Sequence, residues 1–376
     1  MSSRSGNVAS IIIVILVFSA VGGFVFLTNQ YVPSNIAVVT LDTGFNDRSF
    51  ADQAGEGLYM TDVVVSLDIR LAVDLDDAQD IMENIARGGR HDLIIVIGTD
   101  PALHARVQTV ATEFVGQKFA LIGGEVALDN VASATFALDE AAFLGGALAA
   151  YASVETEERN GIVGIIGSVE TDPTVQSLID GFLQGLQYAN ASQDINGTIR
   201  LLPTEYVGSY NDTSTAESIA RDMFDPDDGN ATVIFAPVRA SIMGIRAAME
   251  WANLTYHTEF GNDTTREPFV IGAEAIQDYL GNPNILIASG PSWVIGSVVP
   301  RSDLAVYRIL NATLWDDFPG GLENGSANHT IGSLSNDGVG LLGVEEFREE
   351  NWVTDYMLNV TVDYRQGIIN GTIVVT

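Results

Sequence analysis

Short apolar runs alternate with segments of helical periodicity along most of the chain. The expected strands are Asn35–Leu41, Val63–Ile69, Asp92–Ile97, Lys118–Ile122, Gly161–Ile166, Ile199–Val207, Thr232–Ala236, Phe269–Ile271 and Ile285–Ala288. Most are short and uninterrupted, which is typical of parallel strands covered on both faces. Between them, Ala78–Arg87 is expected to be a helix that begins at Asp76 or Asp77 and ends at Gly88-Gly89. This alternation predicts an α/β fold with doubly wound sheets.

One strand-and-helix scheme occurs twice. It is found in IIVIGTDPALHARVQTVATEF, where Gly98 precedes Thr-Asp-Pro, and again in GIVGIIGSVETDPTVQSLIDGFLQGL. In both, the Asp can cap a helix and the Pro occupies its first turn, where a missing N–H has no consequence. The alternative is that Thr-Asp-Pro is simply a good helix start used twice. The shared strand context favours two Rossmann-like lobes, whose helix N-termini would face one another across a cleft.

The stretch LDTGFNDRSF, residues 41–50, follows the first expected strand and precedes a helix-like segment. Gly44 and Asn46 suit the backbone angles of a tight turn. In open α/β sheets, ligands bind at turns of this kind, beyond the carboxyl ends of the strands. The stretch is therefore a candidate wall of a ligand site, and the alternative is a solvated connector.

Composition and charge narrow the classes of function. The chain has 376 residues, 47% of them hydrophobic, and a formal charge of −32. Such a length accommodates about two domains. The acidic balance argues against nucleic acid as a partner, because no basic surface is available to neutralise phosphates. The many acidic side chains repel one another, and salt screens this repulsion, so the composition is compatible with a salt-loving, archaeal-like host. The absence of cysteine excludes disulfides and thiolate chemistry.

Catalytic motifs are missing from the sequence. The four histidines show no H-E-x-x-H or other metal spacing, and there is no G-x-S-x-G elbow. The strand GIVGIIG lacks the G-x-G-x-x-G phosphate turn. We therefore expect no enzyme, no cofactor and no metal, with a hydrolase that reuses a binding cleft as the alternative.

The N-terminal region indicates the compartment. Residues 11–27, IIIVILVFSAVGGFVFL, carry no charge and follow a single Arg4. This length is at the lower limit for a membrane span and slightly above that of a signal-peptide core. We expect residues 1–30 to form an uncleaved anchor to the membrane, with the rest of the chain outside the cell. A cleaved signal peptide is the alternative.

Glycosylation sequons support the outside location. Eleven N-x-S/T sequons occur, all in the second half of the chain, where about three are expected by chance in the whole chain. The alternative is an Asn- and Thr-rich surface without sugar. The candidate asparagines are Asn190, Asn196, Asn211, Asn230, Asn253, Asn262, Asn311, Asn324, Asn328, Asn359 and Asn370.

The chain resembles the basic membrane protein family of solute-binding proteins. The stretch LDTGFNDRSFADQAGEGL is similar to the opening of that family, which has a strand, a turn ending in N/D-D-x-S-F and a helix with E-G. Further segments match in order over about residues 35–376: DLIIVIG, KFALIGG, NVASATFALDEAAFLGGALAA, GIVGIIGS, GFLQGLQYAN, YVGSYND, PFVIGAEA, RSDLAVY and GIINGTIVV. The resemblance implies a type I periplasmic binding protein fold, in which two α/β lobes are joined by three crossings. It also implies a nucleoside-like ligand and the permease subunits of an ABC importer as partners.

The same resemblance indicates where the ligand would bind. The loop with Asn46, Asp47 and Phe50 is implied to lie beside the ligand, and Phe182 near the wall of the opposite lobe, unless Phe182 is plain core. The candidate ligand-binding residues are Asp42, Asn46, Asp47, Phe50, Gly98, Gly123, Phe182, Arg239, Glu274 and Arg301. Amide and carboxylate groups suit a purine edge, and aromatic rings suit its faces.

Several positions depart from the family pattern. Ala51 and Gly55 replace an Asn and an aromatic residue, and Gly123 replaces an Asp. Glu274 stands where the family has its ribose-binding Asp, and Pro300 replaces a Lys. Glu274 still offers oxygens to two hydroxyls. Arg239 or Arg301 is available to supply the lost cation, unless both are solvated surface partners.

The expected division places residues 35–155 and about 289–320 in the first lobe. Residues 160–285 and about 330–376 form the second. A different class of function also fits the sequence: a membrane-tethered surface receptor or glycoprotein that uses the same fold without transport. The sequons and the altered pocket positions favour that alternative, and the cleft loops favour solute binding.

Overall fold

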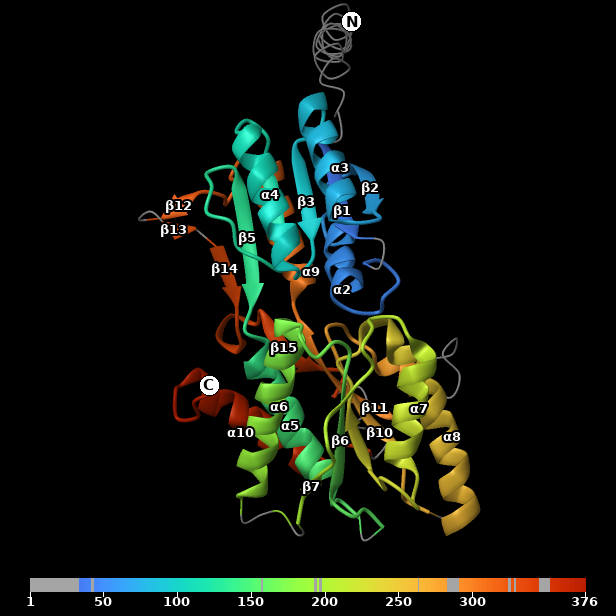
Figure 1. Ribbon diagram of the computed structural model, residues 1–376. Coiled ribbons are helices and arrows are strands. Elements are labelled where there is room, and N and C mark those ends of the chain that lie inside the picture. Colours follow the sequence, from blue (N-terminus) through green and yellow to red (C-terminus); the bar gives the residue numbers. More distant parts are fainter. Residues whose placement is uncertain are drawn as a thin grey trace, which may run out of the picture.

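The computed structural model describes the chain from Ser34 to Thr376, apart from short gaps (Figure 1). The residues outside the description are 1–33, 42–43, 157, 193–194, 196–197, 263, 283–290, 324–325, 328 and 345–351. The expected anchor and the expected strand Ile285–Ala288 lie outside the described residues. Within the described part, no helix has the length and apolar character needed to cross a membrane.

The first sheet is entirely parallel and has the strand order β14–β5–β4–β3–β1–β2. Alternate residues of β1 enter different cores, because Ile36 and Val38 pack with helices α2 and α9, whereas Ala37 and Val39 pack with α3 and α4. The elements are β1 (Ser34–Leu41), α2 (Phe50–Glu56), η1 (Gly57–Tyr59), β2 (Val65–Ala72), α3 (Leu75–Gly88), β3 (Leu93–Ile97), α4 (Pro101–Glu113), β4 (Phe119–Ile122), β5 (Val131–Phe136), α9 (Ser302–Leu314) and β14 (His329–Gly332).

The second sheet has the order β15–β11–β10–β9–β6–β7, with β8 also paired to β6 and only β15 antiparallel to its neighbour. Helices α5, α6 and α10 cover one face, and α7 and α8 the other. The elements are α5 (Leu138–Ala152), β6 (Ile162–Gly167), α6 (Pro173–Asn190), β7 (Arg200–Leu201), β8 (Glu205–Tyr206), α7 (Thr213–Phe224), β9 (Val233–Phe235), η2 (Arg239–Ser241), α8 (Ile242–Phe260), β10 (Phe269–Ala273), η3 (Asp278–Gly281), β11 (Val294–Pro300), η4 (Leu334–Asn336), β15 (Val339–Leu342) and α10 (Asp355–Ile369).

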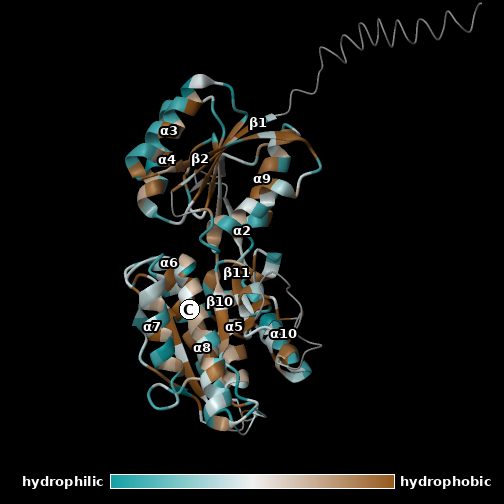
Figure 2. Ribbon diagram, turned by 90° about the vertical axis from the view of Figure 1, so that its right-hand side faces the viewer, coloured by the Kyte–Doolittle hydropathy of each residue, from teal (hydrophilic) through white to brown (hydrophobic). Residues whose placement is uncertain are grey.

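The two sheets form two stacked lobes, each with apolar strands inside and polar helix faces outside (Figures 1 and 2). A small hairpin of β12 (Leu322–Glu323) and β13 (Ser326–Ala327) stands apart from both sheets. In the described residues, the chain passes between the lobes after β5, after β11 and after β14. The α/β fold with parallel sheets is thus confirmed.

Helix α5 is the element that bears most on the lobe boundaries. Its buried side chains lie in the same core as α6 and the strands of the second sheet. Gly146 and Gly185 allow this contact, because a Cβ on Gly146 would lie 1.9 Å from the carbonyl oxygen of Phe182 and one on Gly185 would lie 1.8 Å from that of Phe143. The domain boundaries stay a prediction, and this packing argues for a crossing near residue 137 instead of residue 155.

Several local expectations need correction. The helix at Ala78–Arg87 begins at Leu75 and is capped by Asp74, which accepts a hydrogen bond from the Asp77 N–H, whereas Gly89 ends it in the left-handed conformation as expected. The strand expected at Ile199–Val207 is two short strands, β7 and β8. Pro203 lies between them and has no N–H to donate to a ladder. Strands β5, β11, β14 and β15 were not expected.

Candidate functional site

A cavity of about 560 Å³ lies between the two lobes. Residues at the carboxyl ends of β1 and β3 line it from the first lobe, and residues after β6 and β9 line it from the second. The expectation that the two Thr-Asp-Pro turns face one cleft is confirmed. The lining residues are Thr40, Leu41, Gly44, Asp47, Phe50, Ala51, Ile97, Gly98, Thr99, Asp100, Pro101, Ala102, Leu103, Thr171, Asp172, Pro173, Tyr210 and Arg239.

The Thr-Asp-Pro turns place carboxylates at the cavity wall. The Asp100 side chain accepts a hydrogen bond from the Ala102 N–H at 2.8 Å and so caps α4. Asp172 caps α6 in the same way, accepting from the Thr174 N–H at 2.7 Å. Because each cap uses one carboxylate oxygen, the other oxygen is directed elsewhere. In Asp172 it accepts a hydrogen bond from the Tyr210 hydroxyl at 2.9 Å.

The loop between β1 and α2 is shaped by two residues with left-handed backbone angles, Asn46 and Arg48, at φ 67° and 55°. The Asp52 carboxylate accepts hydrogen bonds from both of their N–H groups, at 2.8 and 2.7 Å. The bent loop carries Asp47 and Phe50 to the cavity wall. Asn46 is exposed to solvent and does not line the cavity, and Asp42 lies outside the described residues.

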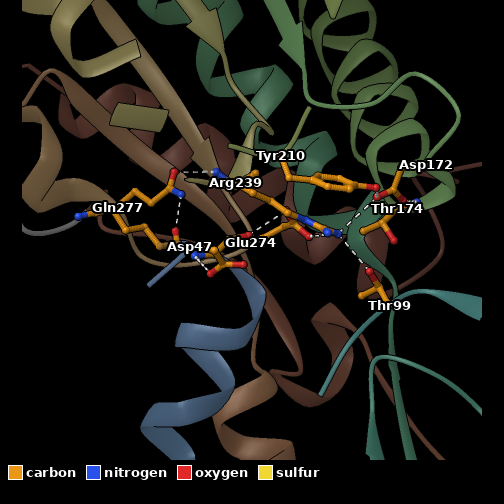
Figure 3. A network of polar contacts seen from close by, with 11 residues as sticks. Asp47, Thr99, Asp172, Thr174, Tyr210, Arg239, Glu274 and Gln277 are labelled. Atoms are coloured by element: carbon orange, nitrogen blue, oxygen red, sulfur yellow. Dashed lines mark hydrogen bonds and ion pairs between the residues drawn. The ribbon is translucent and has the colours of Figure 1, made fainter. Parts of the chain in front are cut away.

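Arg239 links the lobes through a polar network (Figure 3). Its Nε donates to Oε2 of Glu274 at 3.1 Å, and its Nη2 lies 3.3 Å from Oε1 of the same carboxylate. The same Nη2 lies 3.1 Å from Oγ1 of Thr99, which belongs to the first lobe. A second contact between the lobes runs from the Ser49 hydroxyl to Oε2 of Glu274 at 2.9 Å.

Tyr210 and Asp172 complete the surroundings of this guanidinium. The guanidinium carbon of Arg239 lies 4.5 Å from the centre of the Tyr210 ring, within range of a cation–π interaction. Nη2 of Arg239 lies 3.4 Å from Oδ2 of Asp172, the oxygen that also accepts the Tyr210 hydroxyl. The guanidinium is therefore held on several sides while it still lines the cavity.

Burial and neighbouring charge change the ionisation of these groups. Burial, together with the charge of Glu274, raises the pKa of Asp47 to about 8. Burial and the hydrogen bond to Asp172 raise the pKa of Tyr210 to about 12. Burial by itself would lower the pKa of Arg239, but Glu274 and Asp172 raise it overall. At neutral pH the Asp47 carboxyl is therefore largely protonated, and the guanidinium is charged.

Glu274 does not line the cavity. Its side chain is fully buried, and both of its oxygens already accept hydrogen bonds from Arg239 or Ser49. Arg301 also lies outside the lining and pairs with Asp303 at 2.8 Å. Of the two arginines expected to supply a cation, the structure thus brings only Arg239 to the cavity.

The remaining predicted residues, Gly98, Gly123 and Phe182, lie at different distances from the cavity. Gly98 lines the cavity. Gly123 lies behind it with φ 104°, where a Cβ would be 2.7 Å from the Gly98 carbonyl oxygen and 3.0 Å from the Phe50 ring. The missing side chain therefore leaves room for that ring. Phe182 is buried in the second lobe and stacks on Phe235, with ring centres 4.4 Å apart.

Four residues of the network were not singled out from the sequence: Ser49, Thr99, Asp172 and Tyr210. Thr99 and Asp172 belong to the repeated Thr-Asp-Pro turns, so that repeat was a usable signal. Ser49 is part of the loop motif that carries the family resemblance. Tyr210 belongs to YVGSYND, one of the segments that carry the family resemblance, but its contact with Asp172 had no local signal, because the two residues lie 38 apart in the sequence.

The arrangement is suited to binding a small polar molecule. Carboxyl groups of Asp47, Asp100 and Asp172 and the guanidinium of Arg239 line the cavity together with the rings of Phe50 and Tyr210. The carboxylates of Asp100 and Asp172, next to a single, already paired cation, favour a ligand with hydrogen-bond donors over an anionic one. The rings offer apolar faces for a flat or pyranose-like group.

The chain is similar in sequence to curated relatives and in fold to solved structures. The nucleoside-binding protein BmpA of an ABC transporter in Lactococcus lactis is 25% identical over 289 residues, 76% of each chain. The CD4+ T-cell-stimulating antigen of Listeria innocua is also 25% identical, over 90% of this chain and 87% of its own. A solute-binding protein of an ABC transporter system from Aeropyrum pernix superposes with a TM-score of 0.73 at 22% identity, over 92% of this chain and 94% of its own.

A second solved structure is similar in fold alone. The ABC transporter solute-binding protein from Agrobacterium vitis, which holds D-fucose, has a TM-score of 0.54 at 16% identity, over 84% of this chain and 97% of its own. Residues 34–376, the whole range that the structure describes, match the family described as ABC transporter substrate-binding protein PnrA-like. The chain belongs to this family, the Bmp family of substrate-binding proteins.

Proposed function

We propose that this protein is the extracytoplasmic substrate-binding component of an ABC importer and binds a nucleoside or a similar small polar molecule between its lobes. The observation that carries the proposal is the cavity of about 560 Å³, because both Thr-Asp-Pro turns and Arg239 contribute to its wall. A site built from both lobes binds most tightly when the lobes close on the ligand. The family supports the role in transport, and the similarity to the nucleoside-binding protein of Lactococcus lactis supports a nucleoside.

We assign the polar contacts with the ligand to Arg239, Asp47, Asp172 and Thr99. The resemblance implied that Glu274 takes the ribose hydroxyls. Because Glu274 is fully buried and does not line the cavity, we propose that it positions the Arg239 guanidinium instead. Asp172 is then the carboxylate offered to the ligand hydroxyls, and Phe50 and Tyr210 contact its rings.

Isothermal titration calorimetry on the purified full-length protein in detergent tests the ligand class. Adenosine and guanosine are titrated beside D-fucose and D-allose, and binding of a nucleoside with little heat from the sugars is expected. Saturable heat from the sugars alone would replace the nucleoside by a monosaccharide. No heat from any of the four compounds at millimolar concentration would discard both ligand classes.

The contact with Asp172 is tested by Asp172→Asn. Asparagine can still cap α6 with its side-chain oxygen, and the variant replaces the charged Oδ2, which accepts from Tyr210, by an NH2 group. A hydrogen bond to a charged group contributes about 1.5–3 kcal/mol, and we expect affinity to fall roughly ten-fold or more. Asp212→Asn is the matched control, because Asp212 caps α7 in the same way and does not line the cavity. Equal affinities of both variants would remove Asp172 from the ligand contacts.

We further propose that residues 1–30 anchor the protein to the outer side of the cell membrane. The support is the apolar composition of residues 11–27 and the extracytoplasmic role of the family. Deletion of residues 1–30 should release the protein from the membrane fraction. Continued sedimentation of the shortened protein with membranes at high salt would contradict the anchor.

The sequons favour a second candidate function, a tethered surface receptor or glycoprotein without transport. In the described part of the chain, none of the eight candidate asparagines is buried. The two functions differ in uptake: deletion of the gene should abolish import of the bound nucleoside if the protein serves a transporter. Unchanged import in the deletion strain would favour the receptor.

A further inference from the structure

An apolar surface surrounds strand β2, on a protein whose formal charge is −32. Among the described residues, exposed large apolar side chains cluster within a stretch of 15 residues, and Tyr59, Val64 and Val73 are 73%, 68% and 74% exposed. Large exposed patches of this kind mark interaction sites. We name this cluster the β2 edge surface: Tyr59, Met60, Val64, Ile69, Leu71 and Val73.

Strand β2 forms one edge of the first sheet (Figure 1). It pairs with β1 on one side, and no other strand of the described residues pairs with it. The backbone N–H and C=O groups of its outer side are therefore a template for another strand. Soluble proteins usually protect such an edge with charge, proline or a bulge. Here the strand carries one acidic and one basic residue, Asp68 and Arg70, which pair with one another within the chain at 2.7 Å and have Ile69 between them.

The sequence of this strand is complementary to itself. Its centre reads Leu67-Asp68-Ile69-Arg70-Leu71. In an antiparallel pair of two copies with a two-fold axis at Ile69, the Leu67 of one copy lies opposite the Leu71 of the other. Asp68 of one copy then lies opposite Arg70 of the other, and the two Ile69 side chains face one another.

Charge also selects this register. If the two-fold axis lay at Asp68, the Asp68 carboxylates of the two copies would lie opposite one another. If it lay at Arg70, the two Arg70 guanidinium groups would lie opposite one another. Like charges directly opposite are destabilising, whereas opposite charges and apolar pairs stabilise a ladder. The apolar residues share one face, since side chains alternate along a strand. That face is already partly covered within one copy, where Leu67 packs on the core of the first lobe.

We propose that the β2 edge surface is the interface with a second copy of this chain, formed by antiparallel pairing of β2 around Ile69. The pairing joins the two first sheets and covers Ile69, Leu71 and Val73. Tyr59 and Met60 flank the new ladder, beside a groove of about 810 Å³ that they line together with Ile69. None of these residues lines the cavity between the lobes, so the interface leaves that site open.

Cysteine crosslinking tests the interface on the full-length protein, because the chain contains no cysteine. In Ile69→Cys the two introduced thiols would face one another, and mild oxidation should give a disulfide-linked dimer on a non-reducing gel. Val115→Cys is the matched control, since Val115 is 75% exposed and precedes β4, which β3 and β1 separate from β2 in the sheet. We expect at least about ten-fold more dimer from Ile69→Cys than from this control. The oxidation is carried out between about 0.15 and 2 M salt, where the Debye length falls below about 8 Å and charge repulsion between copies is screened. Equal yields from the two variants would overturn the proposal. So would the absence of a dimer from Ile69→Cys over this range of salt.

The register is tested with mixtures and charge changes. Leu67→Cys should crosslink to Leu71→Cys when the two proteins are mixed, and each should crosslink weakly with itself. Self-crosslinking of Leu67→Cys in place of the mixed dimer would contradict antiparallel pairing.

Asp68→Arg, added to Ile69→Cys, should abolish the dimer, and the exchange Asp68→Arg with Arg70→Asp should restore it. A variant that merely misfolds would not be rescued in this way. Loss of the dimer in the exchanged protein would refute the Asp–Arg contact.

Discussion

Nε of Arg239 lies 3.1 Å from Oε2 of Glu274, and both residues have left-handed backbone angles, with φ of 50° and 66°. Such angles cost a non-glycine residue on the order of 1–3 kcal/mol each, and they persist where the surroundings hold them in place. Here the ion pair, Ser49 and Thr99 supply that support. Strained residues of this kind cluster at ligand sites. The strained backbone of this pair therefore holds the Arg239 side chain at the cavity wall.

Removal of the cation from this pair should destabilise the fold. In Arg239→Met, the fully buried Glu274 loses its ion-pair partner, and breaking a buried pair in this way costs about 3–5 kcal/mol. Urea unfolding gives the change in free energy. Arg365→Met is the control, because Arg365 pairs with an exposed Asp337 and such pairs contribute about 1 kcal/mol or less. The double variant Arg239→Met/Glu274→Gln should recover part of the loss. If Arg239→Met were as stable as the control Arg365→Met, the burial of Glu274 would not depend on Arg239.

Asp47 should make stability depend on pH. Its pKa is raised to about 8 from the ordinary value of 3.8. Between these values the folded state binds the proton that the unfolded state has released. Stability should therefore fall as pH rises from about 4 to about 8, by at most about 1.4 kcal/mol per pH unit for this one group.

The pH dependence is isolated by comparison with Asp47→Asn. The introduced asparagine keeps an oxygen that can accept from the Ser49 N–H, as Asp47 does at 2.8 Å, but it does not titrate. Urea unfolding of both proteins at pH 5, 6, 7 and 8 should show a stability difference that grows in favour of Asp47→Asn. A constant difference over this range would mean that Asp47 titrates below it.

Much of the fold could be predicted from the sequence because its central strands are buried on both faces. Runs such as residues 92–97 and 118–122 contain few polar positions, and the observed strands β3 and β4 start one residue later than expected. Strand β5 was missed because its sequence, VASATF, mixes small and polar residues. Strand β15 was missed because it is short and its place depends on antiparallel pairing with β11.

The candidate site could be predicted only where a local motif marks it. The Thr-Asp-Pro turns and the loop before α2 have local signatures, and both line the cavity. The contacts within the Arg239 network have no such signature, because Ser49, Thr99 and Glu274 meet only through the order of strands in two sheets and the contact between lobes. The role expected for Glu274 assumed an open carboxylate, and burial next to Arg239 was not visible in the sequence.

Glycans should be found on exposed sequons and be absent from Asn230. Asn190, Asn211, Asn262 and Asn359 are exposed. Asn230 is half-buried, and its side-chain oxygen accepts a hydrogen bond from the buried Arg266. Attachment of a sugar at Asn230 would have to break this contact. Glycopeptide mass spectrometry of protein purified from its host gives the occupancy. Sugar on Asn230 with none on these four exposed sites would contradict the prediction.

The contact between Arg239 and Thr99 should hold the lobes together before any ligand binds. Nη2 of Arg239, in the second lobe, lies 3.1 Å from the Thr99 hydroxyl in the first. Thr99→Val keeps the shape of the side chain and removes that acceptor. A hydrogen bond to a charged group contributes about 1.5–3 kcal/mol, enough to shift an open–closed equilibrium roughly ten-fold or more. The empty variant should therefore be more open than the empty wild type.

Energy transfer between two dyes measures this opening directly. Cysteines introduced for labelling at Val115 and Leu254 lie on the first and second lobes, and both positions are more than 60% exposed. Thr109→Val is the matched control, because the Thr109 hydroxyl donates to the Ala105 carbonyl within α4 and does not reach the second lobe. We expect lower transfer efficiency in Thr99→Val without ligand, and no change in Thr109→Val. Since no ligand is added, the result does not depend on the nucleoside proposal. Equal efficiencies in the two variants would show that the lobes are held by other contacts, such as the one between Ser49 and Glu274.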